Sequence, residues 1–341
     1  MLQAVGEAVV GALPQRHALA ELSRFYALVR DYPARGGKRL RGQLLLAAIG
    51  AHGGDWRAGV GVAAALELFQ NWVLIHDDVE DDSEDRRGLP ALHRCVGAPV
   101  AINVGDALHV YMWQLLHSQD GLASATQRAV LAEFAWMIQR TAEGQHLDLA
   151  WVEAGRFDVS EAEYLDMVRL KTAYYTVVCP LRLGALCAGE EPRESLSEAG
   201  IDLGVAFQIR DDVLNLMPEI AAQGTGAGTG AELGAGIYGK EFMGDLLEGK
   251  RTLILAHFFA EAGAAERDEV IQVLAKPRAA KTQGEVLRVL GLIDRRGSLR
   301  YAQEVAESSA ERGMRGLREA LEDQQAGALF DLLEPLASRR H

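Results

Sequence analysis

The sequence predicts an all-α protein with a single domain that spans residues 1–341. Three observations support this fold class. Apolar residues recur three and four positions apart through most of the chain, which is the spacing of one face of a helix. Alternating runs rich in Val, Ile and Thr are essentially absent, so no sheet is expected. The chain is 49% hydrophobic and has only 9 prolines, which suits a large packed core.

The predicted helices follow one another from the N-terminus. Residues 1–30 are interpreted as an amphipathic helix and not as a signal peptide, because they lack a basic start and polar residues interrupt them. A long apolar helix begins near Val60 and runs through Asp81. Helical spacing also covers residues 107–117, 129–151, 161–189, 199–217, 285–297 and 328–337.

One segment, residues 221–239, departs from the composition of the rest because it is rich in glycine and has no aromatic residue before Tyr238. Charged residues resume directly after it, so we interpret it as a flexible loop within one domain and not as a linker between two. Loops of this length in compact domains are often either lids over a functional site or disordered segments.

Composition and charge exclude several classes of protein. The net charge of −13 argues against a general nucleic-acid binder, which needs an excess of Lys and Arg. No window of eighteen residues is apolar and free of charge, so no transmembrane span is expected. Three cysteines, Cys95, Cys179 and Cys187, lack the spacing of a metal site and predict free thiols in a reducing, cytoplasmic compartment.

An acidic run fills most positions from Asp77 to Asp85 and ends in Arg86 and Arg87. If the long helix runs through Asp81, then Asp77 and Asp81 share a face, with Asp78 beside them. Their carboxylates repel each other unless a divalent cation lies between them, and Mg²⁺ prefers such oxygen ligands. A solvated helix end would be the ordinary explanation, but the preceding turns are apolar. We therefore expect these acids at the mouth of a cavity.

A second acidic motif, "FQIRDDVLN", ends another apolar helical segment with Asp211, Asp212 and Asn215. Two such motifs are stronger evidence than one, because carboxylates that face each other from two helices can hold a cluster of metal ions. Basic residues accompany the acids and predict a site for phosphorylated anions. They are Arg35, Lys38, Arg39, Arg41, Arg86, Arg87, Lys171, Lys240, Lys250 and Arg251.

The motifs GGKRLRG, DDVED, RRG, KT, FQIRDDVLN and GK…GDLLEGKRT occur in an order that resembles the trans-isoprenyl diphosphate synthases, or polyprenyl synthetases. The resemblance spans Arg35 to Thr252 and is greatest to short-chain geranylgeranyl diphosphate synthases. It implies a helical bundle around a deep central apolar cavity, usually a homodimer. It also implies head-to-tail condensation of isopentenyl diphosphate with dimethylallyl, geranyl or farnesyl diphosphate, assisted by three Mg²⁺ ions that bind with the substrate diphosphate.

The resemblance also assigns roles to particular residues. It implies metal ligation by Asp77, Asp81 and Asp211, with Asp78, Asp212 and Lys171 also in the catalytic set. Residues that match the allylic diphosphate site are Arg86, Lys171, Gln208, Lys240 and Lys250, and those that match the isopentenyl diphosphate site are Lys38, Arg41, Gln70 and Arg87. Thr172 and Phe207 match residues beside the reacting carbons. Asn215 departs from the Asp that many members carry, and the loop before Lys240 is longer than usual.

Product length is expected to depend on Trp72 and Phe69, which lie about 7.5 Å and about 12 Å before Asp77 along the helix axis. In the family, an aromatic residue five positions upstream with no insertion in the DDxxD motif is typical of geranylgeranyl diphosphate synthases. The twenty-carbon product is therefore predicted, with the fifteen-carbon farnesyl product as the alternative. Ordinary core packing is the other interpretation of Trp72.

Two rival functions use similar motifs. A class I terpene cyclase also carries DDxxD, but it would lack the isopentenyl diphosphate residues Lys38 and Arg41 and the second Asp pair. A non-catalytic partner subunit of a heteromeric synthase typically loses one Asp motif, whereas this chain retains both.

Overall fold

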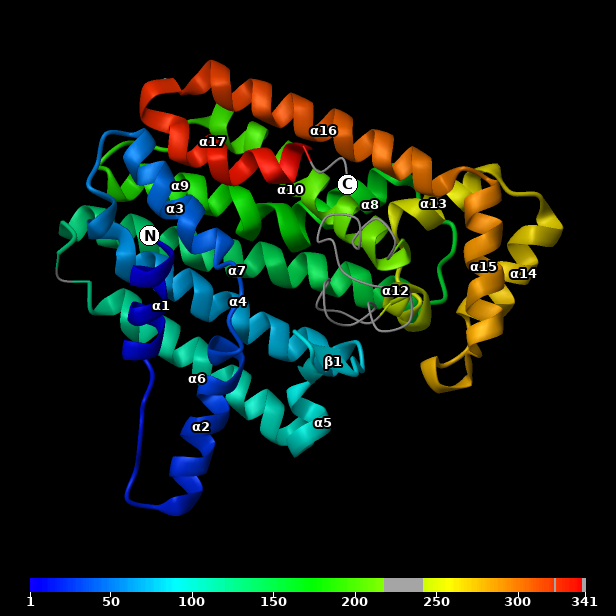
Figure 1. Ribbon diagram of the computed structural model, residues 1–341, viewed down its shortest axis with the longest axis horizontal. Coiled ribbons are helices and arrows are strands. Elements are labelled where there is room, and N and C mark those ends of the chain that lie inside the picture. The colour runs from blue at the N-terminus through cyan, green and yellow to red at the C-terminus, as the bar shows by residue number, and fades with distance from the viewer. Residues whose placement is uncertain (120, 218–241, 322, 339–341) are drawn as a thin grey trace, which may run out of the picture.

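The computed structural model describes residues 1–119, 121–217, 242–321 and 323–338. These residues are almost entirely helical, which confirms the all-α class (Figure 1). The longer helices are α1 (Leu2–Gly11), α2 (Ala20–Ala34), α3 (Leu40–Ala51), α4 (Val60–Glu80), α6 (Ala98–His117), α7 (Ser124–Glu153), α8 (Glu161–Val168), α9 (Cys179–Cys187), α10 (Glu194–Leu216), α13 (Leu253–Glu261), α14 (Ala264–Leu274), α15 (Gln283–Arg295), α16 (Ser298–Ala320) and α17 (Asp323–Ser338). Shorter helical elements are η1 (Trp56–Gly59), α5 (Leu92–Val96), η2 (Arg169–Val178), α12 (Gly244–Glu248) and η3 (Arg278–Ala280).

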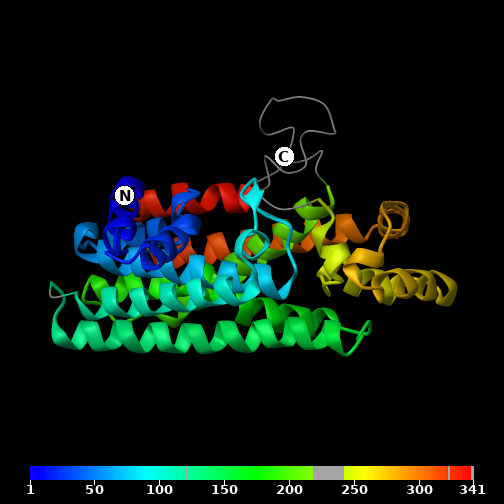
Figure 2. The same ribbon diagram turned by 90° about the horizontal axis from the view of Figure 1, so that it is seen from below.

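The helices form a layered bundle with an arm at one end. Helices α3, α4, α7, α9 and α10 lie side by side, and α16 runs along α10 on the outer face (Figures 1 and 2). The C-terminal helix α17 packs on α3, so both ends of the chain contribute to one body. Helices α14 and α15 project at the right of both views, and we refer to residues 264–295 as the arm.

Helix α4 lies at the centre of the bundle, between α1, α3 and α6. The prediction of a helix from Val60 to Asp81 is confirmed, since α4 ends at Glu80 with Asp81 as its C-cap. The stretch Trp56–Glu80 is long and apolar enough to cross a membrane by length and composition, but 67% of its apolar window is buried inside the protein. It is therefore weak evidence for a membrane span and fits the core helix of a bundle.

A ten-residue π-helical segment, η2, joins α8 to α9 and lies between α7 and α10. Two glycines allow its backbone to approach both neighbours. A Cβ atom at Gly144 of α7 would lie 2.2 Å from the backbone nitrogen of Lys171, and one at Gly204 of α10 would lie 2.4 Å from Ala173 Cα. Wide helical turns of this kind are rare and occur mainly at functional sites. Here η2 carries Lys171, Thr172, Tyr175 and Thr176.

Two expectations from the sequence were wrong. Residues 1–30 contribute to two helices and not one. The helical structure is interrupted between the end of α1 and the start of α2, in the segment that contains Pro14. A minimal antiparallel strand pair, β1 (Asp85–Arg86) and β2 (Leu89–Pro90), follows α4. Its turn residues Arg87 and Gly88 have φ values of 55° and 74°, as a tight hairpin requires at both positions. Strands of two residues are too short to show alternation in the sequence.

Candidate active site

A cavity of about 570 Å³ opens between α4, α7, η2 and α10, and both acidic motifs contribute to its wall. Most of the residues predicted for the site line it, namely Arg41, Phe69, Gln70, Trp72, Asp77, Arg86, Arg87, Lys171, Thr172, Phe207, Gln208, Asp211, Asp212 and Lys250. Asp81 lines a smaller adjoining pocket together with Asp77, as their shared helix face predicts. The predicted Lys240 and the glycine-rich segment 221–239 lie outside the described residues.

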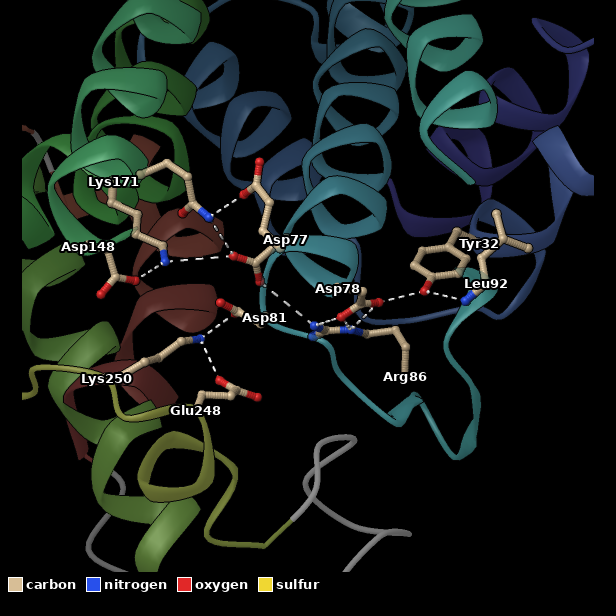
Figure 3. A network of polar contacts seen from close by, with 12 residues as sticks. Tyr32, Asp77, Asp78, Asp81, Arg86, Leu92, Asp148, Lys171, Glu248 and Lys250 are labelled. Carbon is tan, nitrogen blue, oxygen red and sulfur yellow. Dashed lines mark hydrogen bonds and ion pairs between the residues drawn. The ribbon is translucent and has the colours of Figure 1, made fainter. Parts of the chain in front are cut away.

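Asp77 points from α4 into the cavity and meets cations on two sides (Figure 3). Its carboxylate lies 3.7 Å from Lys171 Nζ and 3.8 Å from Arg86 Nη2, and it accepts a hydrogen bond of 3.3 Å from Gln145 Nε2. Lys171 in turn lies 2.5 Å from Asp148 on α7. Burial alone would lower the pKa of Lys171, but the neighbouring carboxylates of Asp148 and Asp77 outweigh it and raise the pKa above its ordinary value. Lys171 is therefore a fixed cation at the cavity wall.

Asp78 does not face the cavity with Asp77, contrary to its expected place among the metal-facing acids. Its side chain is fully buried and accepts hydrogen bonds from Arg86 Nε at 2.9 Å and from Tyr32 Oη at 2.5 Å (Figure 3). The same tyrosine hydroxyl accepts a bond from the Leu92 backbone nitrogen. Burial and the Asp78 charge raise the pKa of Tyr32, so its hydroxyl remains a donor. Asp78 thus links Arg86 of the β1–β2 hairpin to Tyr32 of α2, which in turn contacts Leu92 of α5.

Asp81 is held at the far side of the mouth by a chain of charges. Lys250 Nζ lies 2.6 Å from the Asp81 carboxylate and 3.0 Å from Glu248 on α12 (Figure 3). Burial raises the pKa of the Asp81 carboxyl well above its usual range, although the Lys250 charge acts in the opposite sense. A carboxyl in this state gains from a further cation, because the added charge favours its ionised form.

The second acidic motif presents its two aspartates differently. Both line the cavity, but Asp212 is nearly buried and accepts bonds of 2.7 Å from Tyr164 Oη and from Gln208 Nε2. Asn215 does not direct its amide oxygen into the cavity. This oxygen accepts a bond of 3.1 Å from the backbone nitrogen of Asp245, at the start of α12. The asparagine that replaces the usual Asp therefore supplies a hydrogen-bond acceptor. This bond joins α10 to α12, the helix that precedes Lys250.

The basic residues assigned to the second diphosphate gather at the N-terminus of α3. Arg41 donates to Thr176 Oγ1 at 2.9 Å and lies over the Tyr175 ring, while its buried Nε has no partner in the described protein. The buried Gln70 Oε1 also lacks a protein partner. Arg87 donates to the carbonyls of Tyr32 and Gly36. Lys38 precedes α3, is exposed and is not among the residues that line the cavity.

Aromatic rings lie on the cavity wall near the centre of α4. Trp72 stacks on His109 of α6, with ring centroids 4.1 Å apart and an angle of 15° between the planes. Phe69 meets both Trp72 and Tyr175 edge to face. Several polar residues of the wall were not predicted, namely Gln145, Asp148, Tyr164 and Asp245. Gln145 and Asp148 are three positions apart on α7, which was the only signal that they share a face.

An all-α bundle with an apolar cavity, carboxylates from two helices at its mouth and fixed cations beside them defines the class of helical enzymes that act on diphosphates of apolar chains. The chain belongs to the polyprenyl synthetase family, whose model matches residues 23–292. It is therefore an enzyme of isoprenoid synthesis, a prenyltransferase, as the sequence predicted.

Individual relatives agree with the family. The geranylgeranyl diphosphate synthase of Saccharolobus solfataricus is 34% identical over 83% of this chain and 80% of its own. The geranylfarnesyl diphosphate synthase of Aeropyrum pernix is 33% identical over 81% of each chain. The crystal structure of a geranylgeranyl pyrophosphate synthase from Corynebacterium glutamicum, complexed with isoprenyl diphosphate and magnesium, has a TM-score of 0.87 and 26% identity, with 99% of this chain and 98% of that chain covered.

Proposed function

We propose that this enzyme condenses isopentenyl diphosphate with an allylic diphosphate, head to tail, and that geranylgeranyl diphosphate is its main product. The observation that carries the proposal is the cavity itself. Its apolar wall with Trp72 and Phe69 lies on the same helix as Asp77 and Asp81, so a prenyl chain can extend inward while its diphosphate stays at the charged mouth. The geranylgeranyl diphosphate synthases among the relatives support the same product.

Magnesium suits the donor groups of this site. Mg²⁺ usually takes one or two protein carboxylates and completes its shell with water and substrate phosphate oxygens. We assign Asp77, Asp81 and Asp211 to metal binding, and the common pocket of Asp77 and Asp81 supports this assignment for these two residues. When bound, the metal stabilises the negative charge that develops on the leaving diphosphate.

The residues of the chain supply the rest of the catalytic environment. Lys171 and Lys250 are fixed cations beside the carboxylates and are assigned to the allylic diphosphate, as is Gln208. Thr172 donates to Gln208 Oε1 at 2.8 Å and so orients the amide, whose nitrogen donates to Asp212. Phe207 and the aromatic wall exclude water from the carbocation that remains after the carbon–oxygen bond breaks. The alkene of isopentenyl diphosphate attacks this carbocation, and the released diphosphate takes the proton.

The second diphosphate is assigned to Arg41, Gln70 and Arg87. The partnerless buried atoms of Arg41 and Gln70 support this, because such atoms are costly unless a ligand satisfies them. Arg86 pairs with Asp78, lies beside Asp77 at the mouth and lines the cavity, and we keep it as a proposed contact of the allylic diphosphate. We keep Lys38 and Lys240 as proposed contacts from the family resemblance alone.

The purified chain tests the proposal directly. Incubation with isopentenyl diphosphate, Mg²⁺ and each of dimethylallyl, geranyl and farnesyl diphosphate is expected to yield geranylgeranyl diphosphate. Termination at fifteen carbons would identify the farnesyl alternative. A cyclic hydrocarbon formed without isopentenyl diphosphate would identify a cyclase. Absence of condensation by this chain alone would favour the partner subunit of a heteromeric enzyme.

Trp72 is expected to limit the product length. Its ring lines the cavity five residues before Asp77, and His109 supports the ring from behind. Trp72→Ala removes this obstacle, so products longer than twenty carbons are expected at the expense of geranylgeranyl diphosphate. Trp136→Ala is the matched control, because Trp136 packs on Tyr174 and does not line the cavity. An unchanged product distribution for Trp72→Ala would identify Trp72 as ordinary core packing.

We infer that the enzyme is a homodimer that buries α6. Val100, Ile102 and Val110 lie exposed on this helix, at 39%, 42% and 52% of full exposure. Sedimentation is expected to give twice the mass of 37.0 kDa. Val110→Asp is expected to shift the protein toward the monomer, because a desolvated charge at the interface is costly. Val152→Asp, at a smaller exposed site on α7, should leave the mass unchanged.

We further infer one domain over residues 1–341 and a cytoplasmic location. The packing of α16 and α17 on α10 and α3 supports one domain. The three thiols are all free, which suits a reducing compartment. Recovery of the enzyme in the membrane pellet after cell fractionation would contradict the location.

A further inference from the structure

The arm formed by residues 264–295 contacts the active-site segment through the buried Lys281 as well as through Arg278. Lys281 lies between η3 and α15 and is only 9% exposed, which is unusual for lysine. Its Nζ donates to the carbonyl oxygens of Leu246 at 3.1 Å and Leu247 at 2.5 Å, both on α12. Within the part of the chain that the structure describes, Lys281 forms no ion pair with a carboxylate, so the acceptors of its ammonium are backbone oxygens.

Those carbonyls need an external donor because of the way α12 ends. The helix has five residues and stops at Gly249, which turns to a φ of 77°. The backbone nitrogens of Gly249 and Lys250 both donate to the carbonyl oxygen of Asp245. The next two carbonyls, those of Leu246 and Leu247, therefore have no partner within the helix. Cations are the preferred partners at a helix C-terminus, so Lys281 completes α12 from a different part of the chain.

The segment that Lys281 completes is the one that carries the proposed diphosphate contact. Lys250 follows α12 directly and lies against Asp81 and Glu248. Glu248 also pairs with Arg278 of the arm, at 3.3 Å. The connection therefore runs from the arm through α12 to Lys250 and on to Asp81 of α4.

We propose that Lys281 is a positioning residue, whose charge holds α12 so that Lys250 stands correctly at the allylic diphosphate. The charged groups around its ammonium are Arg251, Arg278 and Glu248, so two like charges oppose one unlike charge. Burying an ammonium group in these surroundings costs more free energy than burying an apolar side chain would. Its presence there implies that the carbonyls need a charged donor. This inference rests on the proposed function of Lys250.

A pH profile separates the charge from the shape of the side chain. Burial, together with Arg251 and Arg278, lowers the pKa of Lys281 to about 8. The protonated form is therefore lost as the pH rises through about 8, and the charge-assisted part of its bonds is lost with it. Arginine stays protonated throughout this range. The ratio kcat/KM for geranyl diphosphate is expected to fall above pH 8 in the unmodified enzyme and to lack this fall in Lys281→Arg.

Lys281→Met provides the main comparison, with Lys276→Met as its matched control. Lys276 belongs to the same arm but pairs with Glu285 and does not contact α12. In Lys281→Met we expect KM for geranyl diphosphate to rise about tenfold and KM for isopentenyl diphosphate to stay within about twofold, because Arg41 and Gln70 lie elsewhere. We also expect faster amide hydrogen exchange at residues 245–250, with unchanged exchange in α3 and α4.

The outcomes distinguish this inference from the proposed function. If the unmodified enzyme carries out no condensation, the proposed function fails, and the exchange comparison still tests whether Lys281 holds α12. Equal changes in both methionine variants, or unchanged exchange at residues 245–250, would overturn the positioning role. Superimposable pH profiles of the unmodified enzyme and Lys281→Arg would overturn the role of the charge.

Discussion

Asp77→Asn is expected to lower kcat by about 10³-fold, because a metal-facing carboxylate is worth several kcal/mol in the transition state and each factor of ten corresponds to about 1.4 kcal/mol. The substitution keeps the shape of the side chain and removes the charge that faces Lys171 and Arg86 at the cavity mouth. Single-turnover assays with isopentenyl and geranyl diphosphate at saturating Mg²⁺ measure the effect on the chemical step.

Glu80→Gln is the matched control for Asp77→Asn. Glu80 lies on the same last turn of α4 and also accepts a bond from Gln145, but its side chain is exposed. The control variant should keep nearly full activity. Similar losses in both variants would mean that acidity of the helix end, and not metal binding by Asp77, determines the rate.

Asp78→Ala is expected to act on stability, with a loss of about 3–5 kcal/mol in the free energy of unfolding, as for other broken buried ion pairs. The substitution leaves the Arg86 guanidinium buried without its carboxylate and removes the acceptor of the Tyr32 hydroxyl. Urea unfolding followed by circular dichroism measures this loss.

Glu84→Ala controls for the removal of an acid from the same segment. Glu84 pairs with Arg94 at the surface, where such pairs contribute at most about 1 kcal/mol. A stable Asp78→Ala enzyme with abolished turnover would contradict the structural role and support the predicted place of Asp78 in the catalytic set.

The contrast between Asp77 and Asp78 shows how far periodicity alone could predict this site. Spacing four residues apart correctly predicted that Asp77 and Asp81 line a common pocket. Neighbours along a helix point about 100° apart, so spacing alone does not decide whether one or both of Asp77 and Asp78 face the cavity. This depends on where α2 and the hairpin lie, and these contacts join residues 46 and 8 positions apart.

Other parts of the structure were beyond prediction for similar reasons. The π-helical η2 depends on Gly144 and Gly204 of two other helices, so its own sequence carries no signal for it. Asn215 was recognised only as a departure from the usual Asp, and the bond that its amide oxygen accepts from the Asp245 backbone at the start of α12 has no signal in the sequence. Lys281 lies in a segment of ordinary polar composition, and only the folded chain brings it to α12.

Helix α4 carries both the aromatic wall and the acidic mouth, and this has a consequence for how the enzyme can evolve. A rigid helix fixes the separation between Trp72 and Asp77. Under the proposed function, a substitution in the aromatic wall would change the depth available to the prenyl chain without moving the carboxylates. The proposed function then implies that single substitutions on α4 can change product length while the rate of bond formation is preserved.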